Sequence, residues 1–275
     1  MSDKLFPHYP GEASFAAIGD SFTEGLNDVG PGGEFRGWAD RLAGLLAAEY
    51  PGLRYANLAV RGKLLRQIVA EQVPAAAAMS PDLVAVAGGG NDILRPGADP
   101  DSLAELFDAA VARLRAGGSQ VLMFTGFDPV GFPLLKLLRG RIGTYNMHLR
   151  AIADARDCYL VDLWSMRFLR AADAWSADRL HLTAGSHQRV ALRACEVLGV
   201  PVTEDWRAPF AADPAPTAVT AMTRAAWLAA RREDVRWAKE YLAPWVNRRL
   251  HGTSSGDGRS PKRPALEPVA PPVLM

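Results

Sequence analysis

Residues 14–25 read SFAAIGDSFTEG, an apolar run that ends in Gly19, Asp20 and Ser21. A short apolar run that stops at glycine and polar residues is typical of a buried strand followed by a loop. The same pattern recurs along the chain. The candidate strands are Ser14–Gly19, Arg54–Leu58, Leu83–Ala87, Gln120–Thr125 and Tyr159–Asp162.

Longer amphipathic patterns separate these runs. They cover Gly37–Tyr50, Leu64 to about Ala78, Asp101–Ala116, Arg141–Arg156 and Ala184–Leu198. Strands that alternate with helices indicate a parallel sheet covered on both faces. We therefore expect an α/β fold, a three-layer α/β/α sandwich around a five-stranded parallel sheet of the flavodoxin-like kind. In such sheets, ligands bind beyond the carboxyl ends of the strands.

The composition changes near residue 200. We expect residues 1–200 to form the main domain and residues 201–250 to form a helical extension that packs on it. A dimer contact or an active-site cover is the alternative role for this extension. Residues 251–275 are rich in Gly, Ser, Pro and basic types, so we expect a disordered tail there.

The bulk composition excludes several functional classes. The 275 residues are 49% hydrophobic and 22% charged with a net charge of +1, which gives no reason to expect nucleic acid as a partner. Cys158 and Cys195 are expected to be reduced thiols. The sequence has no C-x-x-C pair, so we expect no metal site built from cysteines. The sequence contains neither a secretory signal nor a run of transmembrane length, so we expect a cytoplasmic protein without a membrane span.

The first three strands end in residues that suit acyl transfer. Ser21 follows the first strand, where its hydroxyl can face the open edge of the sheet, although a helix-capping serine would look the same. Gly62 follows the second strand and lets a ligand approach the backbone, as an ordinary turn glycine also would. The third strand ends in GGGND (residues 88–92), where Asn91 offers an amide N–H₂.

A fourth polar segment precedes the last helix. Asp178 stands three residues before His181 and can accept a hydrogen bond from its imidazole ring. Such a carboxylate fixes the tautomer of the histidine and supports the imidazolium that forms when the ring takes a proton from serine. His187 is a weaker candidate because it lies inside a helical pattern and lacks a local carboxylate.

These four segments should meet at one edge of the sheet, because each follows a different strand. Together they supply a nucleophile (Ser21), a base (His181) and an orienting carboxylate (Asp178). The backbone N–H groups of Ser21 and Gly62 and the amide of Asn91 supply an oxyanion hole. This set is sufficient for acyl transfer without a metal or cofactor.

The four segments resemble the sequence blocks of the SGNH, or GDSL, hydrolase family. The resemblance extends from Phe15 to about Leu198, with Gly19–Thr23, Gly62, Gly88–Asp92 and Asp178–His181 in the family's order. It implies that residues 1–200 are the catalytic domain of an esterase. It assigns the nucleophile to Ser21 and an oxyanion donor to Asn91. It implies no particular substrate and says nothing of the extension.

The leading hypothesis is a serine esterase that acts on a small-molecule ester, either an acyl ester or an O-acetyl group. An acyltransferase would use the same acyl-enzyme, and a catalytically idle binding protein could use the same fold. The C-terminal extension could contact a protein partner or a second copy of the chain.

Two weaker observations concern the substrate. Residues Phe127–Leu138 are rich in Pro, Gly, Phe and Leu and should form an apolar wall. Basic residues in the loops hint at an anionic substrate group, unless they simply reflect an arginine-rich chain. They are Arg36, Arg61, Lys63, Arg95, Arg139 and Arg141.

Overall fold

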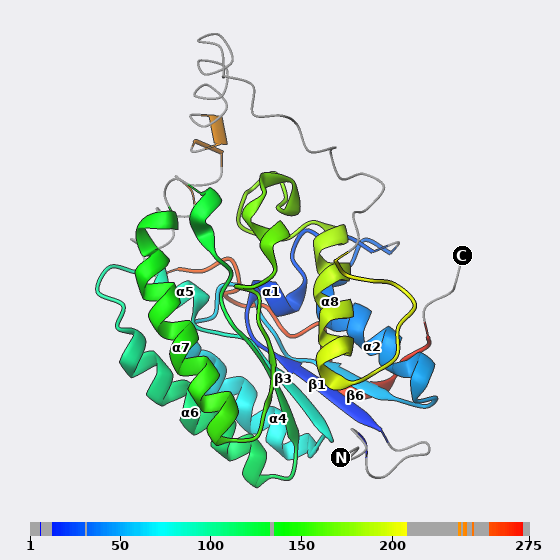
Figure 1. Cartoon of the computed structure of the whole chain (residues 1–275). Coiled ribbons are helices and arrows are strands. Elements are labelled where there is room, and N and C mark those ends of the chain that lie inside the picture. The colour runs from blue at the N-terminus through cyan, green and yellow to red at the C-terminus, as the bar shows by residue number, and fades with distance from the viewer. Residues whose placement is uncertain are drawn as a thin grey trace.

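The computed structural model describes residue 6 and residues 13–30, 32–132, 135–207, 236–237, 239–240, 244 and 253–271. Within these residues, a central sheet has the order β5-β4-β3-β1-β2-β6 (Figure 1). The parallel strands are β1 (Ser14–Ile18), β2 (Arg54–Asn57), β3 (Leu83–Val86), β4 (Gln120–Phe124) and β5 (Tyr159–Val161). Their order confirms the predicted flavodoxin-like topology.

Helices cover both faces of the sheet. The long ones are α2 (Gly37–Glu49), α6 (Pro100–Ala116), α7 (Arg139–Ala155) and α8 (Ala184–Leu198). The short ones are α1 (Ser21–Glu24), α3 (Leu65–Gln67), α4 (Val73–Met79) and α5 (Gly90–Ile93). Side chains of α2 and α8 share one apolar core with the sheet, and those of α3, α4, α6 and α7 share the other. The predicted three-layer sandwich is therefore confirmed (Figure 1).

One predicted helix is interrupted. The pattern from Leu64 to Ala78 predicts a single helix, but the structure has α3, a π-helical turn at Ile68–Gln72 and then α4. Pro74 lies in the first turn of α4, and a proline ring has no N–H to continue the α-helical hydrogen bonds of the preceding turn. The wider π turn accommodates this break.

The sheet has a sixth strand, which corrects the prediction of a five-stranded parallel sheet. Strand β6 (Arg263–Pro268) pairs antiparallel with β2, with Arg54 opposite Pro268 and Tyr55 opposite Glu267. Prolines are tolerated in a strand at the edge of a sheet, where one side needs no ladder hydrogen bonds. β6 occupies that position.

The prediction of a disordered tail is therefore wrong for residues 253–271. We call residues 253–268 the C-terminal strap. Its Lys262 ammonium donates to the carbonyl oxygens of Glu24 (2.6 Å), Phe35 (2.9 Å) and Arg36 (2.9 Å), and it pairs with the carboxylate of Asp40. Composition predicted disorder because the partners that fix the strap lie more than 200 residues away in the sequence.

Most of the predicted helical extension, 208–235 and most of 238–252, lies outside the described residues. Two described parts, 201–207 and 236–237, contact the main domain through Trp206, which donates to Glu196, and Trp237, which donates to Asp178. In the part of the chain that the structure describes, no helix is both long and apolar enough to span a bilayer.

Candidate active site

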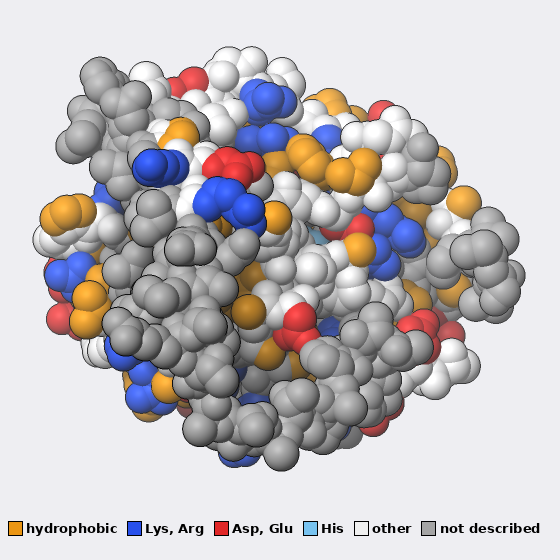
Figure 2. All heavy atoms as spheres, turned by 90° about the horizontal axis from the view of Figure 1, so that it is seen from above, with side chains coloured by type: hydrophobic (Ala, Val, Ile, Leu, Met, Phe, Trp, Pro, Cys, Tyr) orange, Lys and Arg blue, Asp and Glu red, His pale blue; other side chains and the backbone are white. Residues whose placement is uncertain are grey.

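The predicted residues lie at the carboxyl edge of the sheet. Ser21 begins α1 directly after β1, and Gly62 lies in the loop after β2. Asn91 lies in α5, after β3, and the Asp178–His181 segment lies between β5 and α8. Figure 2 looks down on this edge, where described basic, acidic and apolar side chains are interspersed.

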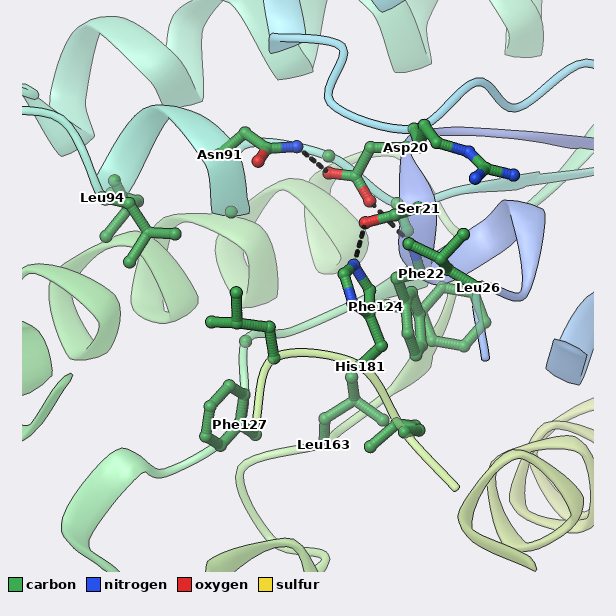
Figure 3. Close-up of a pocket in the computed structure, with 18 of the residues that line it drawn as sticks. Asp20, Ser21, Phe22, Leu26, Asn91, Leu94, Phe124, Phe127, Leu163 and His181 are labelled. Carbon is green, nitrogen blue, oxygen red and sulfur yellow. Dashed lines mark hydrogen bonds between the residues drawn. The ribbon is translucent and has the colours of Figure 1, made fainter. Parts of the chain in front are cut away.

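The hydroxyl of Ser21 does not cap helix α1, because the neighbouring residue Asp20 does. The Oδ1 atom of Asp20 accepts a hydrogen bond from the backbone N–H of Phe22 (3.1 Å), so Asp20 is the N-cap of α1. The Ser21 hydroxyl faces the imidazole ring of His181 instead (Figure 3). Ser21 is therefore not the N-cap of α1.

The backbone before Ser21 is held by a buried glutamine that the sequence did not point to. Gln72 accepts from the N–H of Gly19 (2.7 Å) and donates to the C=O of the same residue (2.9 Å). Gln72 ends the π-helical turn and is 5% exposed. These two hydrogen bonds fix the chain two residues before Ser21. No sequence motif marks Gln72, because its role depends on how α4 packs against β1.

The structure brings the predicted nucleophile, base and carboxylate together. The Nε2 atom of His181 lies 2.9 Å from Oγ of Ser21 (Figure 3). The Nδ1 atom of the same ring lies 2.7 Å from Oδ2 of Asp178. The carboxylate thus holds the ring with Nε2 directed at the hydroxyl. Both distances are within hydrogen-bond range, as general-base activation of a serine requires.

Asp178 is held in its ionised form. Burial raises its pKa, but the hydrogen bond and charge of His181 and the backbone N–H groups of Leu180 and His181 outweigh burial and lower the pKa to about 2. The N–H bonds to Oδ1 are both 3.0 Å long. A further donor, Nδ2 of Asn27, lies 2.7 Å from Oδ2. No sequence motif marks Asn27, although asparagine is a residue type that tolerates the left-handed backbone (φ +72°) found there.

Gly62 and Asn91, the expected oxyanion donors beside Ser21, line the same cavity as Ser21, but the Asn91 amide already donates to two other groups. Gly62 adopts a left-handed backbone (φ +74°), which favours glycine, and it lines the same cavity as Ser21. The Nδ2 atom of Asn91 lies 3.1 Å from both Oδ2 of Asp20 and the carbonyl oxygen of Lys63. The amide of Asn91 is therefore oriented by two acceptors, and donation to an oxyanion needs one of these bonds to be shared.

Asp20 caps α1 and also has an unusually high pKa for a carboxyl group. Burial raises its pKa to about 6, an effect that the Phe22 N–H, the charge of His181 and the Asn91 amide only partly oppose. The carboxyl side chain therefore changes charge within the range in which hydrolases are assayed. Its two oxygens link helix α1, which begins at Ser21, to Asn91.

A cavity of about 430 Å³ opens beside Ser21 and His181. Apolar side chains from the loops after β4 and β5 and from α7 form much of its wall, as Figure 3 shows for Phe127 and Leu163. Phe127 and Leu135 both line it, in agreement with the wall expected from residues 127–138. The size falls in the range typical of small-molecule sites.

The basic residues that hinted at an anionic substrate contribute little to this wall. Among the six, only Arg61 lines the cavity, and its guanidinium is paired with the carboxylate of Glu24. Arg139 is paired with Asp128 instead. The geometry favours the alternative in which these arginines simply reflect composition.

His187 has a structural environment. Its Nδ1 atom accepts from the backbone N–H of Trp38 (3.1 Å), and its ring stacks on Phe22. Burial lowers its pKa to about 3, so the ring is neutral. Among the described residues, no group of three or more His, Cys, Asp or Glu side chains is arranged to hold a metal ion.

Comparison with solved structures shows where this fold has been seen before. LAE5, described as an α/β hydrolase enzyme from the metagenome of Lake Arreo, Spain, is 24% identical, with a TM-score of 0.60 over 70% of this chain and 97% of its own. TesA is 24% identical, with a TM-score of 0.58 over 67% and 97% of the two chains. Axe2, an acetylxylan esterase from Geobacillus stearothermophilus, is 23% identical, with a TM-score of 0.58 over 72% and 97%. These likenesses show a shared fold.

No curated protein matches this chain. The model of the GDSL-like lipase/acylhydrolase family, however, matches residues 17–189, which contain Ser21, Gly62, Asn91, Asp178 and His181. The chain is therefore a hydrolase that belongs to the GDSL-like lipase/acylhydrolase family.

Proposed function

We propose that the protein is a serine esterase that cleaves carboxylic esters through an acyl-enzyme on Ser21. The observation that carries this proposal is the continuous hydrogen-bond chain from the Ser21 hydroxyl through His181 to Asp178, at the mouth of an apolar cavity. A free hydroxyl is a poor nucleophile at neutral pH, and an adjacent imidazole makes it reactive.

In the first half of the reaction, Oγ of Ser21 attacks the carbonyl carbon while Nε2 of His181 takes the hydroxyl proton. Asp178, ionised because its pKa is about 2, stabilises the resulting imidazolium. When the tetrahedral intermediate collapses, His181 gives this proton to the departing alkoxide. The alcohol leaves, and the acyl group remains on Ser21.

In the second half, water takes the place of the alcohol. His181 accepts a proton from the water as its oxygen attacks the acyl carbon, and then returns that proton to Oγ of Ser21. A carboxylic acid leaves and the enzyme is restored. In both halves, the N–H groups of Ser21 and Gly62 and the amide of Asn91 would hold the oxyanion, where removing one donor typically costs about 100- to 1,000-fold in turnover.

The cavity supports an apolar acyl group as the part of the substrate bound beside Ser21. Its wall includes Phe127, Leu135 and Leu163, and Arg61, the one loop cation named above that reaches it, is already neutralised by Glu24. Burying an acyl chain against such a wall is favourable by about 0.8 kcal/mol for each CH₂.

The test is turnover of p-nitrophenyl esters by Ser21→Ala, together with labelling by a fluorophosphonate probe located by mass spectrometry. We expect labelling at Ser21 in the wild type and loss of both turnover and labelling in Ser21→Ala. Ser165→Ala removes an exposed hydroxyl from a loop outside the cavity and serves as the matched control. Undiminished turnover by Ser21→Ala would overturn the proposal.

A further inference from the structure

The C-terminal strap crosses the rim of the active site. Residues Thr253, Ser254 and Ser255 line the same cavity as Ser21, although they stand more than 230 positions later and outside the region matched by the family model. The strap therefore adds hydroxyl-bearing side chains to a cavity whose remaining wall is mainly apolar.

The strap lies in direct contact with the loop that carries Gly62. A Cβ atom added to Gly62 would lie 2.0 Å from Oγ of Ser254, and one added to Gly256 would lie 1.9 Å from the carbonyl oxygen of Arg61. Neither contact leaves room for a methyl group. The turn itself is closed by hydrogen bonds from Ser254 N–H to Asp257 (2.7 Å) and from Gly256 N–H to Oγ of Ser254 (3.2 Å).

The position of the strap is fixed from its other end. Lys262 donates to three backbone carbonyls and to Asp40. Strand β6 begins at the next residue and pairs with β2. Val269 N–H then donates to the carbonyl oxygen of Leu53 (3.0 Å). The wall formed by residues 253–255 is thus built on an anchored segment.

The order of the strands places the two kinds of wall at opposite ends of the cavity. Phe127 follows β4 and Leu163 follows β5, at one end of the sheet, while the strap covers the β2–β6 end. Ser21 follows β1, between them. An ester bound at Ser21 therefore has one part directed to the apolar end and the other to the hydroxyl-bearing strap.

We propose that residues 253–255 are specificity-determining and bind the alcohol part of the ester, selecting alcohols that themselves carry hydroxyl groups. Hydroxyl side chains can both donate to and accept from such groups, whereas they gain nothing from a plain alkyl chain. This inference rests on the proposed esterase function and adds the substrate class that the family leaves open.

The test compares two esters that share an acyl group and an alcohol of equal carbon number: glyceryl monobutyrate and propyl butyrate. We expect the wild type to have a higher kcat/KM for the glyceryl ester. In Ser254→Ala/Ser255→Ala, this preference should fall by about two- to tenfold for each hydrogen bond lost. Ser165→Ala should keep the wild-type preference.

A second variant tests the whole strap. Lys262→Met should release it, raising amide hydrogen exchange in residues 253–268 and lowering the preference for the glyceryl ester. Glu267→Gln removes a charge from the same strand at an exposed position and should leave exchange and preference unchanged. If Lys262→Met does not fold, the serine double variant still decides the question.

The outcomes separate the two proposals. Turnover of both esters with a preference that no strap variant changes would overturn the role of residues 253–255 and leave the esterase intact. Absence of turnover of either ester by the wild type, with no probe labelling at Ser21, would overturn the proposed function and the inference that rests on it.

Discussion

Nδ2 of Asn91 donates to Oδ2 of Asp20 across 3.1 Å, so the amide expected to hold the oxyanion is oriented by the residue before Ser21. The same carboxyl side chain caps α1 through Phe22. One side chain is therefore hydrogen-bonded both to the helix that carries Ser21 and to Asn91, which lie 70 residues apart in the sequence.

Removing the Asp20 carboxyl side chain should lower turnover more than neutralising it. We expect Asp20→Ala to lower kcat by about 10- to 100-fold, less than the full loss of an oxyanion donor, because Asn91 remains but is no longer oriented. Asp20→Asn keeps an oxygen acceptor and should retain most of the activity. Steady-state kinetics on p-nitrophenyl butyrate checks this. Equal kcat values for the two variants would contradict a positioning role.

Asn27 should contribute to activity through Asp178. Its Nδ2 donates to Oδ2 of Asp178 at 2.7 Å, from a left-handed backbone (φ +72°) that glycine also adopts readily. Asn27→Gly removes this hydrogen bond without strain and should lower kcat by about 2- to 10-fold. Asn27→Asp keeps the side-chain size but places a second carboxylate beside Asp178, so its loss at pH 8 should be larger. A milder effect for Asn27→Asp than for Asn27→Gly would rule out this account.

Loss of the Gln72 clamp should destabilise the fold and disturb the nucleophile together. Gln72→Leu leaves the buried N–H of Gly19 without its side-chain acceptor and weakens the bonding of its C=O. We expect about 2–4 kcal/mol less unfolding free energy, measured by urea denaturation. The neighbouring change Glu71→Leu removes only an exposed ion pair with Lys63 and should cost less than about 1 kcal/mol. Similar losses of unfolding free energy in both variants would show that the Gln72 hydrogen bonds do not stabilise the fold more than the surface ion pair does.

The elements of the main sheet could be predicted because each depends on local pattern. The five parallel strands end within one residue of their predicted ends, since each apolar run is followed within three residues by a glycine or a polar residue. The convergence of Ser21 and His181 followed from topology alone, because carboxyl ends of parallel strands share an edge.

The features that escaped prediction depend on distant partners. Strand β6 contains Pro264 and Pro268, which argue against a strand unless an edge position is available, and that position is created by β2. Gln72 and Asn27 have ordinary local sequences, and their partners are fixed only when the layers pack. Ser254 reaches the active site because Lys262 anchors the strap, which composition alone presents as a disordered tail.

Acid should destabilise the protein through His187. Burial lowers the pKa of its ring from 6.5 to about 3, an effect that the nearby Asp28 carboxylate opposes only in part, and the ring accepts a hydrogen bond from the N–H of Trp38 only when Nδ1 is unprotonated. The unfolded chain therefore binds the proton more tightly, so stability is lost as the pH falls below about 6.5. Between pH 7.5 and 4.5, this group should remove about 3 kcal/mol. His187→Asn retains an acceptor near the position of Nδ1 and should lose less stability over the same range in urea unfolding, although it is less stable at pH 7.5 because it leaves a cavity. An equal pH dependence in the two proteins would show that His187 is not the group that senses acid.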